Sequence, residues 1–188
     1  MIRIGILGDI GSGKSFVSKN FGFPVFNADF EVSKLYRGNK KIFLALKKNL
    51  PKYITSFPVD KKEITEAILA NKGNLNKIIK IVHLEVRKKL NIFLRKNKKK
   101  KFVILDIPLL LENKINKKND ILIFIQANNY EITKRLKKRP NFNLKIFKKF
   151  KKIQLSLDYK KKKSQFIIKN NFLKKPVKKE IESILNKI

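Results

Sequence analysis

The stretch Gly8-Asp9-Ile10-Gly11-Ser12-Gly13-Lys14-Ser15 decides the fold, because it matches the pattern G-x-x-x-x-G-K-[ST] at every position. The apolar run 2–7 before it predicts a buried strand, and residues 14–21 after it predict a helix. Between a strand and a helix, glycines let successive backbone N–H groups turn toward a phosphate, and the helix dipole adds attraction. A glycine-rich turn that carries Lys-Ser by chance is the alternative, and the flanking strand and helix favour a phosphate-binding loop.

Two side chains of this loop have separate predicted roles. Lys14 is expected to reach the β- and γ-phosphates of a nucleoside triphosphate, and the Ser15 hydroxyl is expected to coordinate Mg²⁺. A GTPase would also carry Asn-Lys-x-Asp after a later strand, and the segment 116–120 has the wrong spacing for that signature. The loop therefore predicts triphosphate binding and leaves the reaction open.

Strands alternate with helices along the chain, which is typical of an α/β fold with a parallel sheet. Apolar runs predict five strands, at 2–7, 24–27, 102–105, 121–125 and 165–168. After the first helix, further helices are expected at 30–36, at 131–138 and from Pro176 onward.

The segment 40–97 contains no convincing strand but several helical patterns, including a capping box at 60–63 and a plausible stop at Gly73. We therefore predict one P-loop chain with a helical insertion at 40–97 and a basic, helical lid region at 139–163. The remaining segments form the predicted nucleotide-binding core, namely 1–36, 102–138 and 164–188.

Composition restricts the class of protein. The formal net charge of +33 suggests nucleic-acid binding, but lysine is spread through the whole chain together with abundant asparagine and isoleucine. That pattern is typical of codon bias in an A+T-rich genome, so we expect no specific nucleic-acid partner. Cysteine is absent, which excludes disulfides, and no run of about 18 apolar residues predicts a membrane span. We expect a cytoplasmic monomer with no membrane partner.

Three further segments narrow the prediction. They are Val-Phe-Asn-Ala-Asp at 25–29, the strand-and-turn segment 102–112 that ends in Pro-Leu-Leu-Leu-Glu, and Arg-Leu-Lys-Lys-Arg at 135–139. Together with the loop, they resemble the dephospho-coenzyme A kinase family over nearly the full length, in the family's order and spacing. The resemblance implies a P-loop kinase-like three-layer fold and ATP-dependent phosphorylation of the ribose 3′-hydroxyl of dephospho-CoA, the last step of CoA synthesis.

Within the family pattern, Asp29 matches the aspartate proposed to take the proton from the acceptor hydroxyl. Its position just past a strand end would place it in the crevice where open α/β sheets bind ligands, and alcohol attack on a phosphate needs such a carboxylate. The alternative is that Asp29 only caps a helix that begins at Phe30.

The resemblance also implies the nucleotide contacts. Arg135 and Arg139 match the arginines of the family's lid, where Arg139 stabilises charge on the transferring group alongside Lys14 and Asp29. We expect these two arginines to share a helix face, although a solvated basic helix is the alternative. ATP is then the phosphoryl donor, bound by Gly8, Gly11, Ser12, Gly13, Lys14, Ser15, Phe16, Arg135 and Asn170.

Acceptor contacts follow by the same resemblance. Asp29, His83, Arg87, Pro108 and Leu109 are the implied substrate-binding residues. Asp106 lies at a strand end and is a second candidate beside Ser15 for holding Mg²⁺. Glu112 is interpreted instead as a helix-terminus or ion-pair residue.

The chain departs from the family pattern at Asp9, Phe16, Leu84, Pro140 and Gln165. Asp9 is the most unusual departure, because a carboxylate inside an anion-binding loop weakens its attraction for phosphate. Three other functions stay open at this point: a P-loop kinase of nucleosides or nucleotides, a nucleic-acid-associated ATPase suggested only by charge, and a structural protein that keeps the loop without catalysis.

Overall fold

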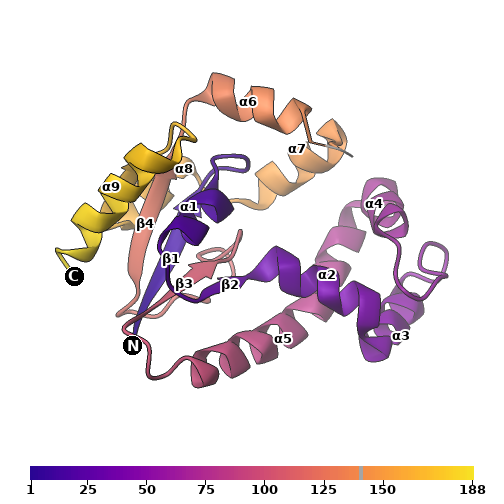
Figure 1. Cartoon of the computed structure of the whole chain (residues 1–188). Helices are drawn as coiled ribbons and strands as arrows, with labels where there is room; N and C mark the ends of the chain where they lie inside the picture. Colours follow the sequence, from indigo (N-terminus) through magenta and orange to yellow (C-terminus); the bar gives the residue numbers. More distant parts are fainter. Residues whose placement is uncertain (140–141) are drawn as a thin grey trace. The chain divides into compact units, whose positions relative to one another are not determined.

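A computed structural model describes residues 1–139 and 142–188 (Figure 1). Its five strands form one parallel sheet, as the sequence predicted, and their order in the sheet is β2-β3-β1-β4-β5. The strands are β1 (Ile2–Gly8), β2 (Val25–Asn27), β3 (Phe102–Asp106), β4 (Ile121–Gln126) and β5 (Phe166–Lys169). Because all strands are parallel, their carboxyl ends lie at one edge of the sheet.

The chain divides into two compact units. The first, residues 1–27, 97–143 and 150–188, contains the whole sheet with α1 (Lys14–Asn20), α6 (Asn129–Lys137), α8 (Leu157–Lys163) and α9 (Lys174–Leu185). The second, residues 28–96 and 144–149, contains α2 (Ala28–Gly38), α3 (Lys40–Asn49), α4 (Lys61–Ala70) and α5 (Lys72–Lys96). Residues of α7 (Leu144–Ile153) belong to both units.

Alternate residues of β1 point to opposite faces of the sheet. Ile4 and Ile6 are fully buried in a core cluster with Val17 of α1 and with Val177 and Ile181 of α9. Figure 1 shows α1 and α9 together beside the sheet. This apolar packing, with each large aliphatic side chain contributing about 1.5–3 kcal/mol, holds the first helix and therefore the loop before it.

The opposite face of β1 is closed by other elements. A Cβ on Gly5 would lie 2.6 Å from the Leu110 side chain and 2.8 Å from that of Leu122, so the turn after β3 packs closely here. Two residues further on, Glu112 pairs with Lys160 of α8 at 2.8 Å, and the Lys160 side chain is 1% exposed. The sheet of the first unit therefore has helices on both faces, which is the three-layer arrangement that the family resemblance implied.

Two local predictions in the second unit need correction. Asp60 does cap α4, since its Oδ1 accepts a hydrogen bond from the Lys62 amide at 2.9 Å. Glu63 does not complete the predicted capping box, because its Oε1 accepts from the amide and hydroxyl of Thr55 and from the Ser56 amide. Desolvation raises the pKa of Glu63, but these hydrogen bonds together outweigh it and keep the pKa below its usual value.

The predicted stop at Gly73 is wrong. Helix α4 ends at Ala70, and Asn71 follows in an extended conformation. The Asn71 Oδ1 accepts a hydrogen bond from the Gly73 amide at 2.7 Å, so Gly73 lies in the first turn of α5. The short polar side chain of Asn71 supplies the interruption that the glycine was expected to supply.

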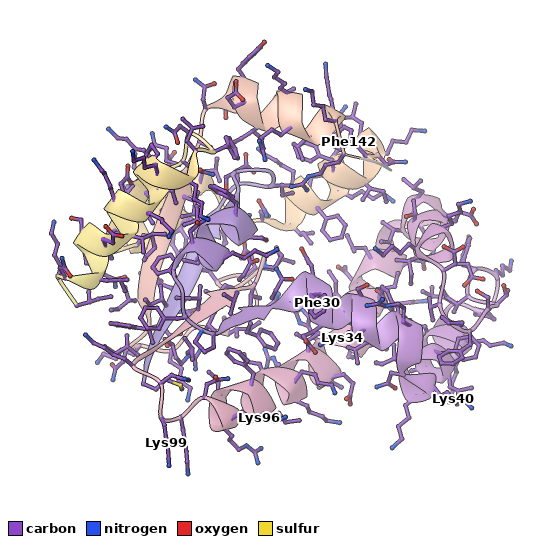
Figure 2. All side chains as sticks on the ribbon, viewed as in Figure 1. Phe30, Lys34, Lys40, Lys96, Lys99 and Phe142 are labelled. Carbon is purple, nitrogen blue, oxygen red and sulfur yellow. The ribbon has the colours of Figure 1, made fainter. Side chains whose placement is uncertain are left out.

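Lysine side chains are distributed over helices of both units. Figure 2 shows Lys40 of α3 and Lys99, which follows α5, pointing away from the ribbon, and both are exposed. Lys160 is the contrasting case because it is buried in an ion pair. Within the described ranges 1–139 and 142–188, no helix is both long enough and apolar enough to cross a bilayer.

Candidate active site

The loop between β1 and α1 has a backbone that requires glycine. Gly13 immediately precedes α1 with φ 88° and ψ 24°, a left-handed conformation that side chains disfavour. A Cβ on Gly13 would also lie 2.2 Å from Asn170 Nδ2, and one on Gly8 would lie 2.7 Å from the Ile125 carbonyl oxygen. The loop is thus packed closely against the connection that follows β5 and against β4, which keeps its amides at the start of α1.

Lys14, the first residue of α1, points back over its own loop. Its Nζ donates to the Asp9 carbonyl at 2.7 Å and to the Gly8 carbonyl at 3.2 Å. The Ser15 side chain is exposed, whereas Ser12 Oγ is buried and has no partner among the described residues. An ammonium group and a helix N-terminus at the same loop together favour an anionic ligand.

Asn27 connects the loop to the sheet edge. In the register of β2 and β3 it stands opposite Asp106, and its Nδ2 donates to Asp106 Oδ2 at 2.6 Å. The same Nδ2 lies 3.5 Å from Ser15 Oγ. No role was predicted for Asn27, although a polar residue at the end of β2 beside an acidic end of β3 was a usable signal.

The oxygen donors at this edge fit Mg²⁺. Asp106 is 3% exposed and ends β3, while Ser15 offers a hydroxyl at the start of α1. Among the residues that the structure describes, no group of three or more acidic, histidine or cysteine side chains could hold a metal. Mg²⁺ in phosphoryl-transfer sites takes few protein ligands and completes its shell with water and phosphate oxygens, so a small donor set suits it.

Asn170 lies behind the phosphate loop and uses both ends of its amide. Its Nδ2 donates to the Ser12 carbonyl at 2.8 Å, and its Oδ1 accepts from the Phe172 amide at 2.9 Å. The Arg135 guanidinium carbon lies 4.1 Å from the centre of the Phe172 ring. The structure therefore brings Arg135 and Asn170 together around Phe172, which no sequence pattern had singled out.

The prediction that Arg135 and Arg139 share a helix face is wrong. Helix α6 ends at Lys137, and Arg139 follows in a turn closed by a bond from its amide to the Leu136 carbonyl. Both arginine side chains are exposed. The i, i+4 argument was wrong because it assumed that the helix continues through the second arginine.

Asp29 belongs to the second unit, where it is exposed in the first turn of α2. The helix begins at Ala28, so Asp29 is not the residue that precedes a helix starting at Phe30. A carboxylate in the first turn is favoured by the helix dipole. Asp29 follows Asn27 by two residues, at the point where β2 gives way to α2.

His83 and Arg87 lie one turn apart on α5 of the second unit. His83 is half-buried, and burial followed by the positive charge of Arg87 lowers the pKa of the imidazole. The imidazole is therefore neutral at pH 7, so it offers hydrogen bonds, while the exposed Arg87 offers the charge.

Pro108 and Leu109 begin the turn after β3 and are partly exposed. The turn is held by a bond from the Asn113 amide to the Leu109 carbonyl at 3.1 Å. Glu112 Oε1 receives the Lys160 ammonium at 2.8 Å and the Leu155 amide at 3.0 Å. The interpretation of Glu112 as an ion-pair residue is confirmed.

Two other departures from the family pattern have structural roles. Phe16 packs against the core cluster of the first unit. Gln165 continues the pairing of β5 with β4, because its Oε1 accepts from the Leu122 amide at 2.7 Å. Leu84 is 65% exposed on α5, and Pro140 lies outside the described residues.

A glycine-rich loop after the first strand of a parallel five-stranded sheet, with polar groups at the carboxyl ends of the neighbouring strands, is the arrangement of the P-loop kinases. The model of the dephospho-CoA kinase family matches residues 2–175. The chain belongs to that family, which places it among the ATP-dependent kinases.

Individual relatives agree with this assignment. A dephospho-CoA kinase of Wolbachia pipientis wMel is 33% identical over 190 residues, which cover 98% of this chain and 97% of the relative. Among solved structures, a Thermus thermophilus protein matches with a TM-score of 0.77 at 22% identity, covering 100% of this chain and 97% of the other. A dephospho-CoA kinase from Campylobacter jejuni matches with a TM-score of 0.64 at 22% identity, covering 98% and 96%. The structural matches support the fold.

Proposed function

We propose that this chain transfers the γ-phosphoryl group of ATP to the ribose 3′-hydroxyl of dephospho-CoA, giving CoA and ADP. The observation that carries the proposal is the Ser15–Asn27–Asp106 arrangement beside the phosphate loop, in a chain that belongs to the dephospho-CoA kinase family. It puts a hydroxyl and a buried carboxylate at the sheet edge where ligands of such folds bind.

In the proposed reaction, the backbone amides of the loop and the Lys14 ammonium bind the triphosphate. The 3′-oxygen forms a bond to the γ-phosphorus, the bond from that phosphorus to the β,γ-bridging oxygen breaks, and the hydroxyl proton passes to Asp29. Arg139 stabilises charge on the transferring group. Catalysis of this kind is positioning plus electrostatics, without a covalent intermediate.

The remaining site residues complete the proposal. Ser15 and Asp106 would hold Mg²⁺, which supplies positive charge to the phosphates when it is bound. Arg135 and Asn170 act on the nucleotide side. For the acceptor we propose His83, Arg87, Pro108 and Leu109. We further propose that the enzyme is a monomer and that it acts in the cytoplasm, where ATP is available.

The test is release of ADP with dephospho-CoA, nucleosides, nucleoside monophosphates or RNA added in separate assays. We expect turnover with dephospho-CoA and a product phosphorylated at the 3′ position. Turnover only with a nucleoside or a nucleotide would identify a different small-molecule kinase. Stimulation only by RNA, with steep salt dependence, would identify a nucleic-acid-associated ATPase instead.

The role of Asp29 has a matched control on the same helix turn. Asp29→Asn is expected to lower kcat at least about 100-fold, because the hydroxyl loses its proton acceptor, while the Kd for ATP stays within about twofold. Glu31→Gln removes the other carboxylate of the first turn of α2 and should leave kcat unchanged within about twofold. An Asp29→Asn enzyme with normal kcat would remove Asp29 from the base role.

A further inference from the structure

Asp9 places a carboxylate inside the phosphate-binding loop. Its side chain is buried, and the residue is 6% exposed. Oδ1 accepts a hydrogen bond from the Ile10 amide at 2.7 Å, and the Asp9 main-chain oxygen accepts one from Lys14 Nζ at 2.7 Å. A negative charge at this position repels a triphosphate, and burial strengthens the repulsion because water screens it less.

The charge of Asp9 is matched by a lysine far away in the sequence. Lys151 Nζ lies 2.6 Å from Asp9 Oδ2, across 142 residues of sequence, and both residues belong to the first unit. The Lys151 side chain is 47% exposed, whereas that of Asp9 is 9% exposed. Both carboxylate oxygens of Asp9 are therefore engaged, one by the loop backbone and one by an ammonium group from α7.

The other charges near Asp9 do not replace this pair. A cavity of about 210 Å³ beside the loop is lined by Asp9 and Ser12 and, from α8, by Asp158 and Lys161. Asp158 and Lys161 carry opposite charges and together add no net charge to this lining, whereas the Lys151 ammonium contacts the Asp9 carboxylate directly. Without Lys151, the Asp9 carboxylate would act on the phosphate site and on the Lys14 ammonium, which already contacts the Asp9 main chain.

We propose that Lys151 is a positioning residue for ATP binding: by pairing with Asp9 it offsets the repulsion between that carboxylate and the phosphates of ATP. The proposal rests on the proposed function of Gly8–Ser15 as the ATP-binding loop. Lys151 acts through Asp9 and does not contact the substrate. It makes a loop that carries an acidic residue competent to bind a polyphosphate.

The test compares four variants, Lys151→Met, Asp9→Gly, their combination, and Lys152→Met as the control at the exposed neighbouring lysine. MgATP affinity is measured by calorimetry, and KM for ATP and kcat are measured with dephospho-CoA. Lys151→Met is expected to raise Kd and KM for ATP about tenfold and to change kcat less than about twofold. In the Asp9→Gly background the same substitution should change neither value, and Lys152→Met should behave as the wild type.

An equal loss of affinity with Asp9 present and in the Asp9→Gly background would overturn the proposal, because Lys151 would then act on the phosphates directly. Unchanged affinity in Lys151→Met would also overturn it. Two further variants keep the test decisive if Lys151→Met folds poorly. Lys151→Arg keeps the ion pair and should bind MgATP as tightly as the wild type. Asp9→Asn removes the negative charge and should also keep the wild-type affinity. If the variants change MgATP affinity as expected but the wild-type chain does not phosphorylate dephospho-CoA, the proposed acceptor is refuted and the role of Lys151 stands. A wild-type chain that does not bind MgATP would refute both.

Discussion

Asp106 and Asp120 are buried aspartates at opposite ends of the same parallel sheet, and their partners differ in charge. Asp106 ends β3, is 3% exposed and accepts a hydrogen bond from the neutral amide of Asn27. Asp120 precedes β4, is 5% exposed and pairs with Arg3 at 2.9 Å. The ion pairs among the described residues do not include Asp106.

The difference shows how equal burial can serve stability or ligand binding. A buried carboxylate that pairs with an arginine has its charge neutralised within the protein, and removal of the arginine lowers the free energy of unfolding strongly. A buried carboxylate that is held by an amide keeps its orientation, while its charge remains available to a cation. The end of the sheet with the amide-bonded aspartate is the end that carries the phosphate loop.

Arg3→Met would remove the arginine that pairs with Asp120. Of the proposed substitutions it should have the largest effect, lowering the free energy of unfolding by about 3 kcal/mol at pH 7. Burial already raises the pKa of Asp120, against the opposing effects of the Lys117 amide and of Arg3. Without Arg3 that pKa rises further. A carboxyl group whose folded pKa is raised contributes stability below its unfolded pKa and loses it as pH rises through the folded value.

The Arg3→Met variant should therefore lose less stability near pH 4 than at pH 7, as measured by urea unfolding at both values. Lys118→Met removes a positive charge from an exposed position near Asp120 and serves as the control. A loss of stability that is the same at both pH values would contradict the assignment of Arg3 as the group that compensates Asp120.

Asp106→Asn tests the other end of the sheet. It removes the negative charge while an amide oxygen still accepts from Asn27, so unfolding free energy should change by less than about 1 kcal/mol. We expect kcat/KM for ATP to fall about 100-fold, or about 2.7 kcal/mol of transition-state stabilisation, because the charge that we propose holds Mg²⁺ is lost. Asp120→Asn is the matched control and should leave this ratio unchanged. A fall of the same size in both variants would indicate a general structural effect.

His83 differs from both aspartates because its neighbour Arg87 has the same charge as a protonated imidazole. Burial and Arg87 lower its pKa, so its contribution to stability is present above the unfolded pKa near 6.5 and is lost as pH falls through the folded value. Since His83 is only half-buried, this contribution should be below about 1 kcal/mol. Thermal unfolding at pH 5.5 and 7.5 should show a pH dependence that is reduced in His83→Gln. Arg87→Gln, which removes the like charge, should also reduce it, and an unaltered slope in both variants would contradict this explanation.

The fold was largely predictable because its signals are local. The apolar runs placed all five strands within about one residue of the observed bounds, since strands buried on both faces read as continuous apolar segments. The helix ends were less accurate: Asn71, and not Gly73, interrupts the chain between α4 and α5, and α6 begins at Asn129, two residues before its predicted start. Helix ends depend on single hydrogen bonds that composition does not reveal.

The site was predictable only in part. Local spacing was enough to identify the phosphate loop, and strand ends indicated Asp29 and Asp106. Asn27, although it lies in the quoted segment 25–29, and Phe172 were given no predicted role. Their relevance comes from contacts, the first with Asp106 across 79 residues of sequence and the second with Arg135.

The sequence by itself determined that a strand, a glycine-rich loop and a helix would form a phosphate-binding turn, because those elements depend on residues close together in the chain. Only the tertiary structure decided how the charges of that turn are balanced. Asp9 looked like a defect in an anion-binding loop until folding brought Lys151 to it from α7. Charge compensation depends on distance in space, and an interval of 142 residues leaves no local trace of it.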